Sequence, residues 1–188
     1  MNIKSLTTQF YTLNRKELLL LLSALIIIFT LASAKFQTKV WWKCIMSVLL
    51  LAAAGYIFAI TVFTRAPGSV TSSVNFTPFY AYYTFFTGQN TEAMRTCIMN
   101  MILFAPLGLF AGDLFPKSFP IWKKVLCIVI PCCLLSIGVE SLQYLRQCGE
   151  VELDDVINNT FGAFLGVLCV PLLSKKQVFM FWNKITRK

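Results

Sequence analysis

Carboxylates and side-chain amides are the groups of this chain best suited to chemistry, and they gather in one stretch. Residues 140–166 contain five of the eight acidic residues, namely Glu140, Glu150, Glu152, Asp154 and Asp155. Apolar runs lie on both sides of them. A charged side chain at the centre of a bilayer costs about 2.5–3.5 kcal/mol on insertion scales, so an ionisable residue inside such a run is functional by default. The stretch is therefore the first candidate for a binding or catalytic site.

The residues of this stretch are expected to have different roles, which depend on where each lies relative to the predicted helices. Ser136, Glu140 and Gln143 share one helical face because they lie four and then three residues apart. For Glu140 and Asp155 the alternative to function is a buried hydrogen bond that fixes helix packing. Asp154 also suits an N-cap of the helix that follows. Glu150 and Glu152 are expected to be solvated loop charges.

The composition predicts an integral membrane protein of the all-α class. Of the 188 residues 57% are hydrophobic and 13% are charged, whereas soluble domains carry about 25% charged residues. Histidine is absent and the seven cysteines form no CxxC pair, so we expect no metal and no cofactor. The net charge of +9 comes from residues that flank apolar runs, which favours contact with anionic lipid over nucleic acid.

Five membrane spans are expected in a single membrane domain comprising residues 1–188. The apolar runs place them at about 18–34, 44–63, 94–115, 125–144 and 156–173. Residues 64–93 combine many aromatic residues with Pro, Gly and Ser. This mixture predicts an interfacial or re-entrant loop and not a further span.

The orientation follows from the basic residues, since 11 of the 17 Lys and Arg residues lie on one side of the predicted bundle. The positive-inside rule then places the C-terminus in the cytoplasm and the N-terminus outside. With this topology the polar side chains of different spans meet toward the outer leaflet. We predict that a ligand-binding cluster there comprises Arg65, Asn100, Glu140, Gln143, Asp154, Asp155, Asn158 and Asn159. Arg65 either snorkels to the interface or is a counter-charge to the acidic residues or to an anionic ligand.

Two GxxxG pairs predict which spans pack together. One pair is Gly108 and Gly112 in the third span, and the other is Gly162 and Gly166 in the fifth. Small residues at this spacing let helix backbones approach closely. We expect the third and fifth spans to run in the same direction and to lie in contact, with Glu140 of the fourth span nearby.

Three motifs carry a family resemblance. They are the segment from Asn100 to Gly108 (NMILFAPLG), the E-x-x-Q of Glu140 and Gln143, and the segment from Leu153 to Gly162 (LDDVINNTFG). Because it has these three motifs in this order and spacing, the sequence resembles the VanZ-like family of small bacterial membrane proteins over about residues 65–166. Many members have a Gly-Arg pair shortly before the aspartates. Cys148-Gly149 stands there in this chain, and Arg146 is the candidate substitute.

The resemblance implies a role at the cell envelope of Gram-positive bacteria, where some members lower susceptibility to teicoplanin and related lipoglycopeptides. Three mechanisms remain open. The protein could bind a lipoglycopeptide or a lipid-linked cell-wall precursor. It could be an intramembrane enzyme whose Glu140 and Asp155 act as an acid/base pair or hold Mg²⁺, or it could be a small transporter or assembly subunit. We favour binding, because the sequence contains no phosphate loop, evident nucleophile or histidine that would support the enzyme.

Overall fold

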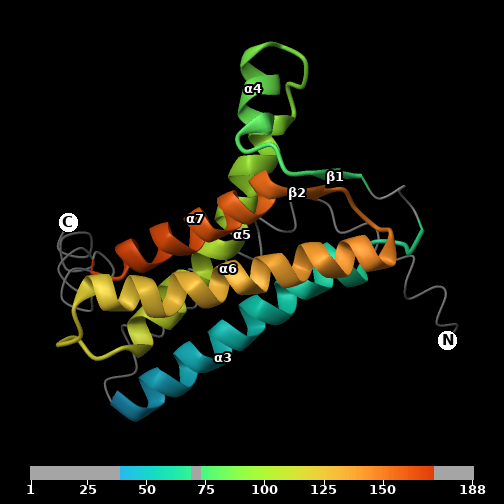
Figure 1. Ribbon diagram of the computed structural model, residues 1–188. Coiled ribbons are helices and arrows are strands. Elements are labelled where there is room, and N and C mark those ends of the chain that lie inside the picture. The colour runs from blue at the N-terminus through green and yellow to red at the C-terminus, as the bar shows by residue number, and fades with distance from the viewer. Residues whose placement is uncertain (1–38, 69–72, 172–188) are drawn as a thin grey trace, which may run out of the picture.

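The computed structural model describes residues 39–68 and 73–171, and this part of the chain is mainly helical (Figure 1). Helix α3 (Lys39–Phe58) continues into the π-helix η1 (Ala59–Phe63). The following elements are β1 (Val74–Asn75), α4 (Tyr80–Phe86), α5 (Ala93–Leu114), α6 (Ile121–Arg146), β2 (Val151–Glu152) and α7 (Leu153–Cys169). The predicted first span at 18–34 lies outside the described residues, as do both chain termini.

Three helices are long and apolar enough to cross a membrane, and they cover Val40–Phe63, Ala93–Leu114 and Ile121–Arg146. They coincide within a few residues with the predicted second, third and fourth spans, so the all-α membrane bundle is confirmed. The predicted fifth span is a 17-residue helix that begins three residues earlier than expected. This shift moves the two aspartates from the connecting loop into the first turn of α7.

Helices α5 and α7 touch backbone to backbone at the predicted glycines. A methyl group added at Gly162 would lie 2.1 Å from the Met101 carbonyl oxygen, and one added at Gly108 would lie 1.9 Å from the Ala163 carbonyl oxygen. At Gly166 the added methyl would lie 2.0 Å from the Ala105 carbonyl oxygen. The two helices therefore approach as closely as the GxxxG pairs predict, and only glycine fits at these three positions.

The apolar core lies among α3, α5, α6 and α7. Its largest fully buried side chains include Phe104 and Phe110 of α5, with Met46 and Ile57 of α3. Large apolar side chains also cover the outer faces of the long helices, for example Leu51, Leu126, Leu134 and Leu145. Outward-facing apolar residues suit a bundle whose surroundings are lipid.

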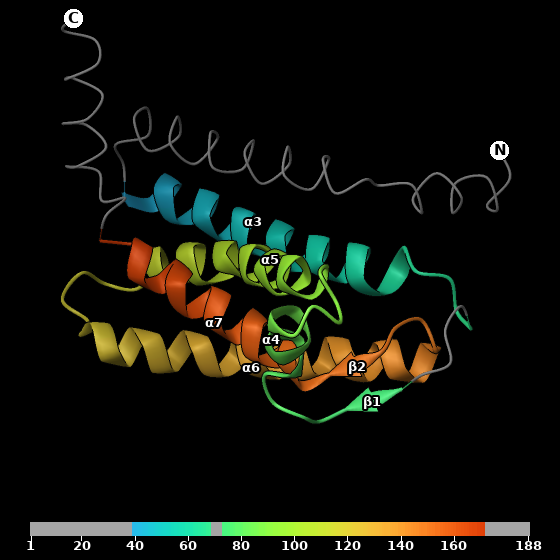
Figure 2. The ribbon, with the colours of Figure 1, turned by 90° about the horizontal axis from the view of Figure 1, so that it is seen from above.

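Residues 64–93 fold into a compact connection that contains β1 and α4. The strand β1 pairs in parallel with β2, so that Val74 lies opposite Val151 and Asn75 opposite Glu152. Helix α4 projects sideways from the bundle at the level where α5 and α7 begin, short of the far ends of α3 and α6 (Figures 1 and 2). Its aromatic side chains are largely exposed, and Phe86 is 77% exposed.

Candidate functional site

A pocket of about 630 Å³ lies between α4, the start of α5 and the loop that joins α6 to α7. Three acidic residues line it, Glu150, Glu152 and Asp155, together with one basic residue, Arg65. The rest of the lining is Tyr80, Ala81, Thr84, Asn90, Ala93, Thr96, Cys97, Cys148 and Gly149. The charged lining has a surplus of two negative charges when all four groups are ionised, which favours a ligand with cationic groups.

Asp155 connects this pocket with the interior of the bundle. Asn100 Nδ2 donates a 2.6 Å hydrogen bond to Asp155 Oδ1, which joins the first predicted motif to the third. Glu140 lies behind the pocket and is only 4% exposed. It accepts a hydrogen bond from the Glu152 backbone amide, and the charges of Asp155 and Arg65 act on it. The two carboxylates that were predicted to be functional therefore lie close together.

Asp154 has a different partner from the one that the sequence suggested. Its two carboxylate oxygens accept hydrogen bonds from the backbone amides of Phe79 (2.5 Å) and Ala81 (2.7 Å). The N-cap position of α7 belongs to Glu152, which makes no side-chain cap. The prediction that Asp154 caps its own helix is wrong. The buried carboxylate instead accepts hydrogen bonds from two backbone amides at the start of α4.

A second contact holds α4 in place. The Tyr82 hydroxyl donates a 2.5 Å hydrogen bond to Asn158 Oδ1. Burial raises the pKa of Tyr82, and this change is reinforced by Cys97 and by the Asp154 charge. The hydroxyl therefore remains a proton donor at neutral pH. Asn158 and Asp154 together attach α4, which forms one wall of the pocket, to the start of α7.

Gln143 and Arg146 hold the π-helix that precedes Arg65. Gln143 Nε2 donates to the Thr61 carbonyl oxygen at 3.2 Å, and Arg146 Nη1 donates to the Val62 carbonyl oxygen at 2.7 Å. The Arg146 guanidinium also lies 5.7 Å from the centre of the Phe63 ring. A π-turn interrupts the regular helical hydrogen bonds and is frequent at functional sites. Here the end of α6 fixes the turn that leads to Arg65.

These contacts correct the expectation for the basic group beside the aspartates. Arg146 does not line the pocket, whereas Arg65 does. A methyl group added at Gly149 would lie 2.6 Å from Arg65 Nη1 and 2.8 Å from Gln143 Oε1. The Cys148-Gly149 pair therefore leaves room for the Arg65 guanidinium, which takes the place that was proposed for Arg146.

Removal of the Arg146 side chain is expected to loosen the π-turn. In Arg146→Ala the Val62 carbonyl loses a charge-assisted hydrogen bond, and we expect the protein to lose about 1–3 kcal/mol of stability. Arg95→Ala is the matched control, because Arg95 forms an exposed pair with Glu92 at 3.2 Å and such pairs contribute about 0–1 kcal/mol. Thermal unfolding in detergent measures both. Equal midpoints for the two variants would contradict the role of Arg146.

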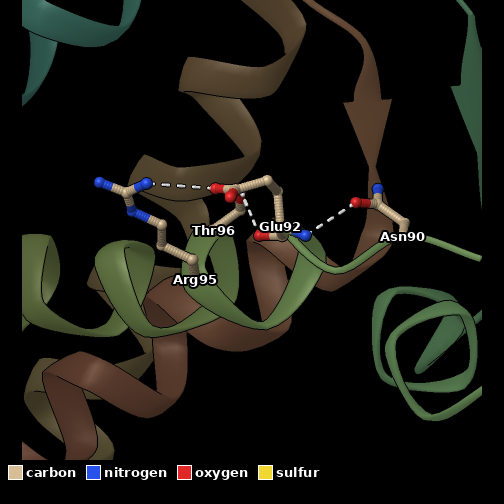
Figure 3. Close-up of polar contacts among 4 residues, drawn as sticks. All are labelled: Asn90, Glu92, Arg95 and Thr96. Carbon is tan, nitrogen blue, oxygen red and sulfur yellow. Dashed lines mark hydrogen bonds and ion pairs between the residues drawn. The ribbon is translucent and has the colours of Figure 1, made fainter. Parts of the chain in front are cut away.

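The start of α5 contributes to the pocket lining, and Figure 3 shows the polar contacts in this turn. Asn90 Oδ1 accepts a 3.0 Å hydrogen bond from the Glu92 backbone amide. Glu92 binds Arg95, and its carbonyl oxygen accepts from the Thr96 hydroxyl at 3.4 Å. The local contacts of Asn90 and Thr96 thus order the turn from which both residues line the pocket.

The loop acids were expected to be solvated, and this holds only for Glu150. Glu150 is exposed at the pocket edge, whereas Glu152 is half-buried. Burial raises the pKa of Glu152, and the charges of Glu150 and Asp154 raise it further. A cationic ligand would relieve this repulsion.

Sequence reasoning missed several residues of the site, namely Tyr82 as the partner of Asn158 and Tyr80, Thr84, Cys97 and Cys148 in the lining. Tyr82 belongs to a dense aromatic run, which was the only available signal. The seven cysteines at positions 44–169 are all free thiols, and those at 97, 132 and 148 are buried.

Comparison with known proteins places the chain in a family. The family model described as VanZ/LLP1 matches residues 18–174, which is most of the chain. The chain belongs to the VanZ/LLP1 family. It is 33% identical over 103 residues to Protein VanZ of Enterococcus faecium, and this match covers 55% of each protein. The chain thus spans about half the length of that curated relative. No solved structure matches.

In this VanZ/LLP1 protein the three sequence motifs meet in space. Asn100 of the first motif contacts Asp155 of the third, and Glu140 of the second lies within electrostatic range of Asp155. Gly108 of the first motif packs against the α7 backbone. The motifs therefore describe one structural unit, although its binding role stays a prediction.

Proposed function

We propose that this VanZ/LLP1 protein lowers susceptibility to teicoplanin and related lipoglycopeptides by binding the antibiotic at the outer side of the bacterial membrane. The observation that carries this proposal is the pocket itself, which combines a surplus of acidic groups with a neighbouring aromatic helix. Lipoglycopeptides combine cationic groups with a lipid tail. The acidic pocket would bind the cationic groups of such a ligand, and the aromatic helix α4 would contact its lipid tail.

The acidic lining supports the first part of the correspondence. A cationic group in the pocket would be attracted by Asp155, Glu150 and Glu152, and the interaction is stronger at a partly desolvated site than in water. The Arg65 guanidinium could bind one acidic or carbonyl group of the same ligand. Electrostatic complementarity of this kind contributes mainly to specificity and to the rate of association.

The position of α4 supports the second part. Tyr83 and Phe86 lie three residues apart on one face of α4, Phe79 comes directly before the helix, and all three are exposed. The helix projects from the side of the bundle (Figure 1). Aromatic side chains are favoured at membrane interfaces, so a ligand anchored in lipid would reach the pocket alongside α4. Membrane-borne cell-wall precursors have the same route of access.

The proposal predicts that isosteric neutralisation of the carboxylates removes protection. Cells that express Asp155→Asn or Glu140→Gln should become as susceptible to teicoplanin as cells that lack the protein, because the first substitution removes a charge from the pocket lining and the second changes the buried carboxyl group behind it. The measurement is the inhibitory concentration at matched protein levels in the membrane. Glu92→Gln is the control, since Glu92 lies outside the pocket lining and pairs with Arg95. Wild-type protection in both the Asp155→Asn and the Glu140→Gln variant would refute the proposal.

A further inference from the structure

The interface between α6 and α7 contains two polar pairs that lie beneath the pocket. At the deeper pair, Asn159 Nδ2 donates a 2.9 Å hydrogen bond to Ser136 Oγ. One turn further toward the connecting loop, Glu140 of α6 lies near Asp155 of α7 and is affected by its charge. Two carboxylates, an amide and a hydroxyl are thus gathered in a short section of one helix–helix contact.

Two oxygen atoms of this cluster lack a partner among the described residues. They are Glu140 Oε2 and Asn159 Oδ1, and both atoms are buried. Each residue is only 4% exposed. While Glu140 is ionised both atoms are acceptors and cannot satisfy one another, and a buried polar group without a partner is unfavourable. In that state the two oxygen atoms suit a bound cation or a hydrogen-bond donor.

Charge and donor type identify the class of that species. Glu140 and Asp155 carry two negative charges when ionised, and the Arg65 charge acts on both. The Glu152 carboxylate acts on both as well, so negative charge is in excess around this pair. All donors are oxygen atoms, which suit hard cations and not the softer metals that prefer sulfur or imidazole. Within residues 39–68 and 73–171 no three His, Cys, Asp or Glu side chains are grouped as a metal-binding set, and this cluster combines two carboxylates with two neutral groups. The observations therefore favour a monovalent cation.

We propose that Glu140, Asp155, Asn159 and Ser136 bind one monovalent cation, with sodium as the expected ion. Asp155 also lines the pocket, so the ion enters there and reaches Glu140 from Asp155. The bound ion neutralises the buried charge and joins α6 to α7 beneath the pocket. This site shares Glu140 and Asp155 with the proposed antibiotic site, but its test is done without antibiotic, so the two proposals can fail separately.

The test is thermal unfolding of the full-length protein in detergent, without antibiotic. Sodium chloride replaces N-methyl-D-glucamine chloride at constant ionic strength and pH. A ligand that binds only the folded state stabilises it in a saturable manner, and we expect the midpoint to rise by about 3–6 °C at about 150 mM sodium. Glu140→Gln and Asn159→Ala should abolish the rise, whereas Glu92→Gln should retain it. Glu140→Gln is isosteric and removes a buried charge, so it should fold without sodium.

Two results would overturn the proposal. The first is a wild-type midpoint that does not respond to sodium, including the case in which it responds only to pH, because a proton would then be shared between the carboxylates. The second is an equal sodium response in the wild type and in Glu140→Gln, which would place the ion elsewhere. The sodium titration of the wild-type protein shows whether the midpoint responds to sodium even if a variant fails to fold.

Discussion

Gly162→Ala is expected to lower the unfolding midpoint of the protein in detergent by about 2–12 °C. The added methyl group would lie 2.1 Å from the Met101 carbonyl oxygen and 2.7 Å from the Met101 carbonyl carbon. Backbone atoms cannot rotate away as a flexible side chain can, so α5 and α7 must separate. Overpacking costs about 1–3 kcal/mol and occasionally more, and each kcal/mol shifts the midpoint by about 2–4 °C in a chain of this size.

Gly138→Ala is the matched control for this prediction. Gly138 lies in α6, and a methyl group added there meets no atom within 4 Å. Alanine is favoured over glycine within a helix by about 1 kcal/mol, so Gly138→Ala should be neutral or slightly stabilising. If Gly162→Ala unfolds at the same temperature as Gly138→Ala, the backbone contact between α5 and α7 is absent in the protein.

Asp154→Ala is expected to release α4 from the bundle while the long helices stay folded. The substitution removes the acceptor of both the Phe79 and the Ala81 backbone amides. Loss of a buried, charged acceptor costs about 2–4 kcal/mol, which corresponds to roughly 30- to 1000-fold faster amide exchange. Hydrogen exchange measured over α4 by mass spectrometry reports this change directly.

Glu150→Ala is the control for Asp154→Ala, because it removes a charge from the pocket without removing the acceptor of the α4 amides. Glu150 also lines the pocket, but it is exposed and is not a partner of the α4 amides. Exchange in α4 should therefore be unchanged in Glu150→Ala. Slow exchange in α4 of both variants would mean that Asp154 does not hold this helix.

The parts of the fold that could be predicted are those with local signals. Long apolar runs gave the spans at 44–63, 94–115 and 125–144 within a few residues of the observed helices, because length and hydropathy define a span. The glycine spacing predicted the contact of α5 with α7, because close approach requires small residues at one face. The face shared by Ser136, Glu140 and Gln143 is buried as a unit.

Other features depend on partners that are distant in the sequence. Asp154 binds amides that lie 73 and 75 residues before it, and no local pattern distinguishes this role from an N-cap. The π-turn at Ala59–Phe63 depends on donors 82 and 84 residues later, from Gln143 and Arg146. The mistaken role of Arg146 has the same cause, since its direction is set by the Val62 carbonyl and not by its distance from the aspartates in sequence.

The central claim is that the acidic pocket binds a cationic amphiphile, and a direct binding measurement tests it most closely. Teicoplanin is titrated into the full-length protein in lipid nanodiscs, alongside a derivative that lacks the acyl tail and alongside empty nanodiscs. We expect saturable binding of teicoplanin to the wild-type protein, about tenfold weaker binding to Asp155→Asn, and weaker binding of the derivative without the tail. Equal binding to the wild type, to Asp155→Asn and to empty nanodiscs would contradict the account.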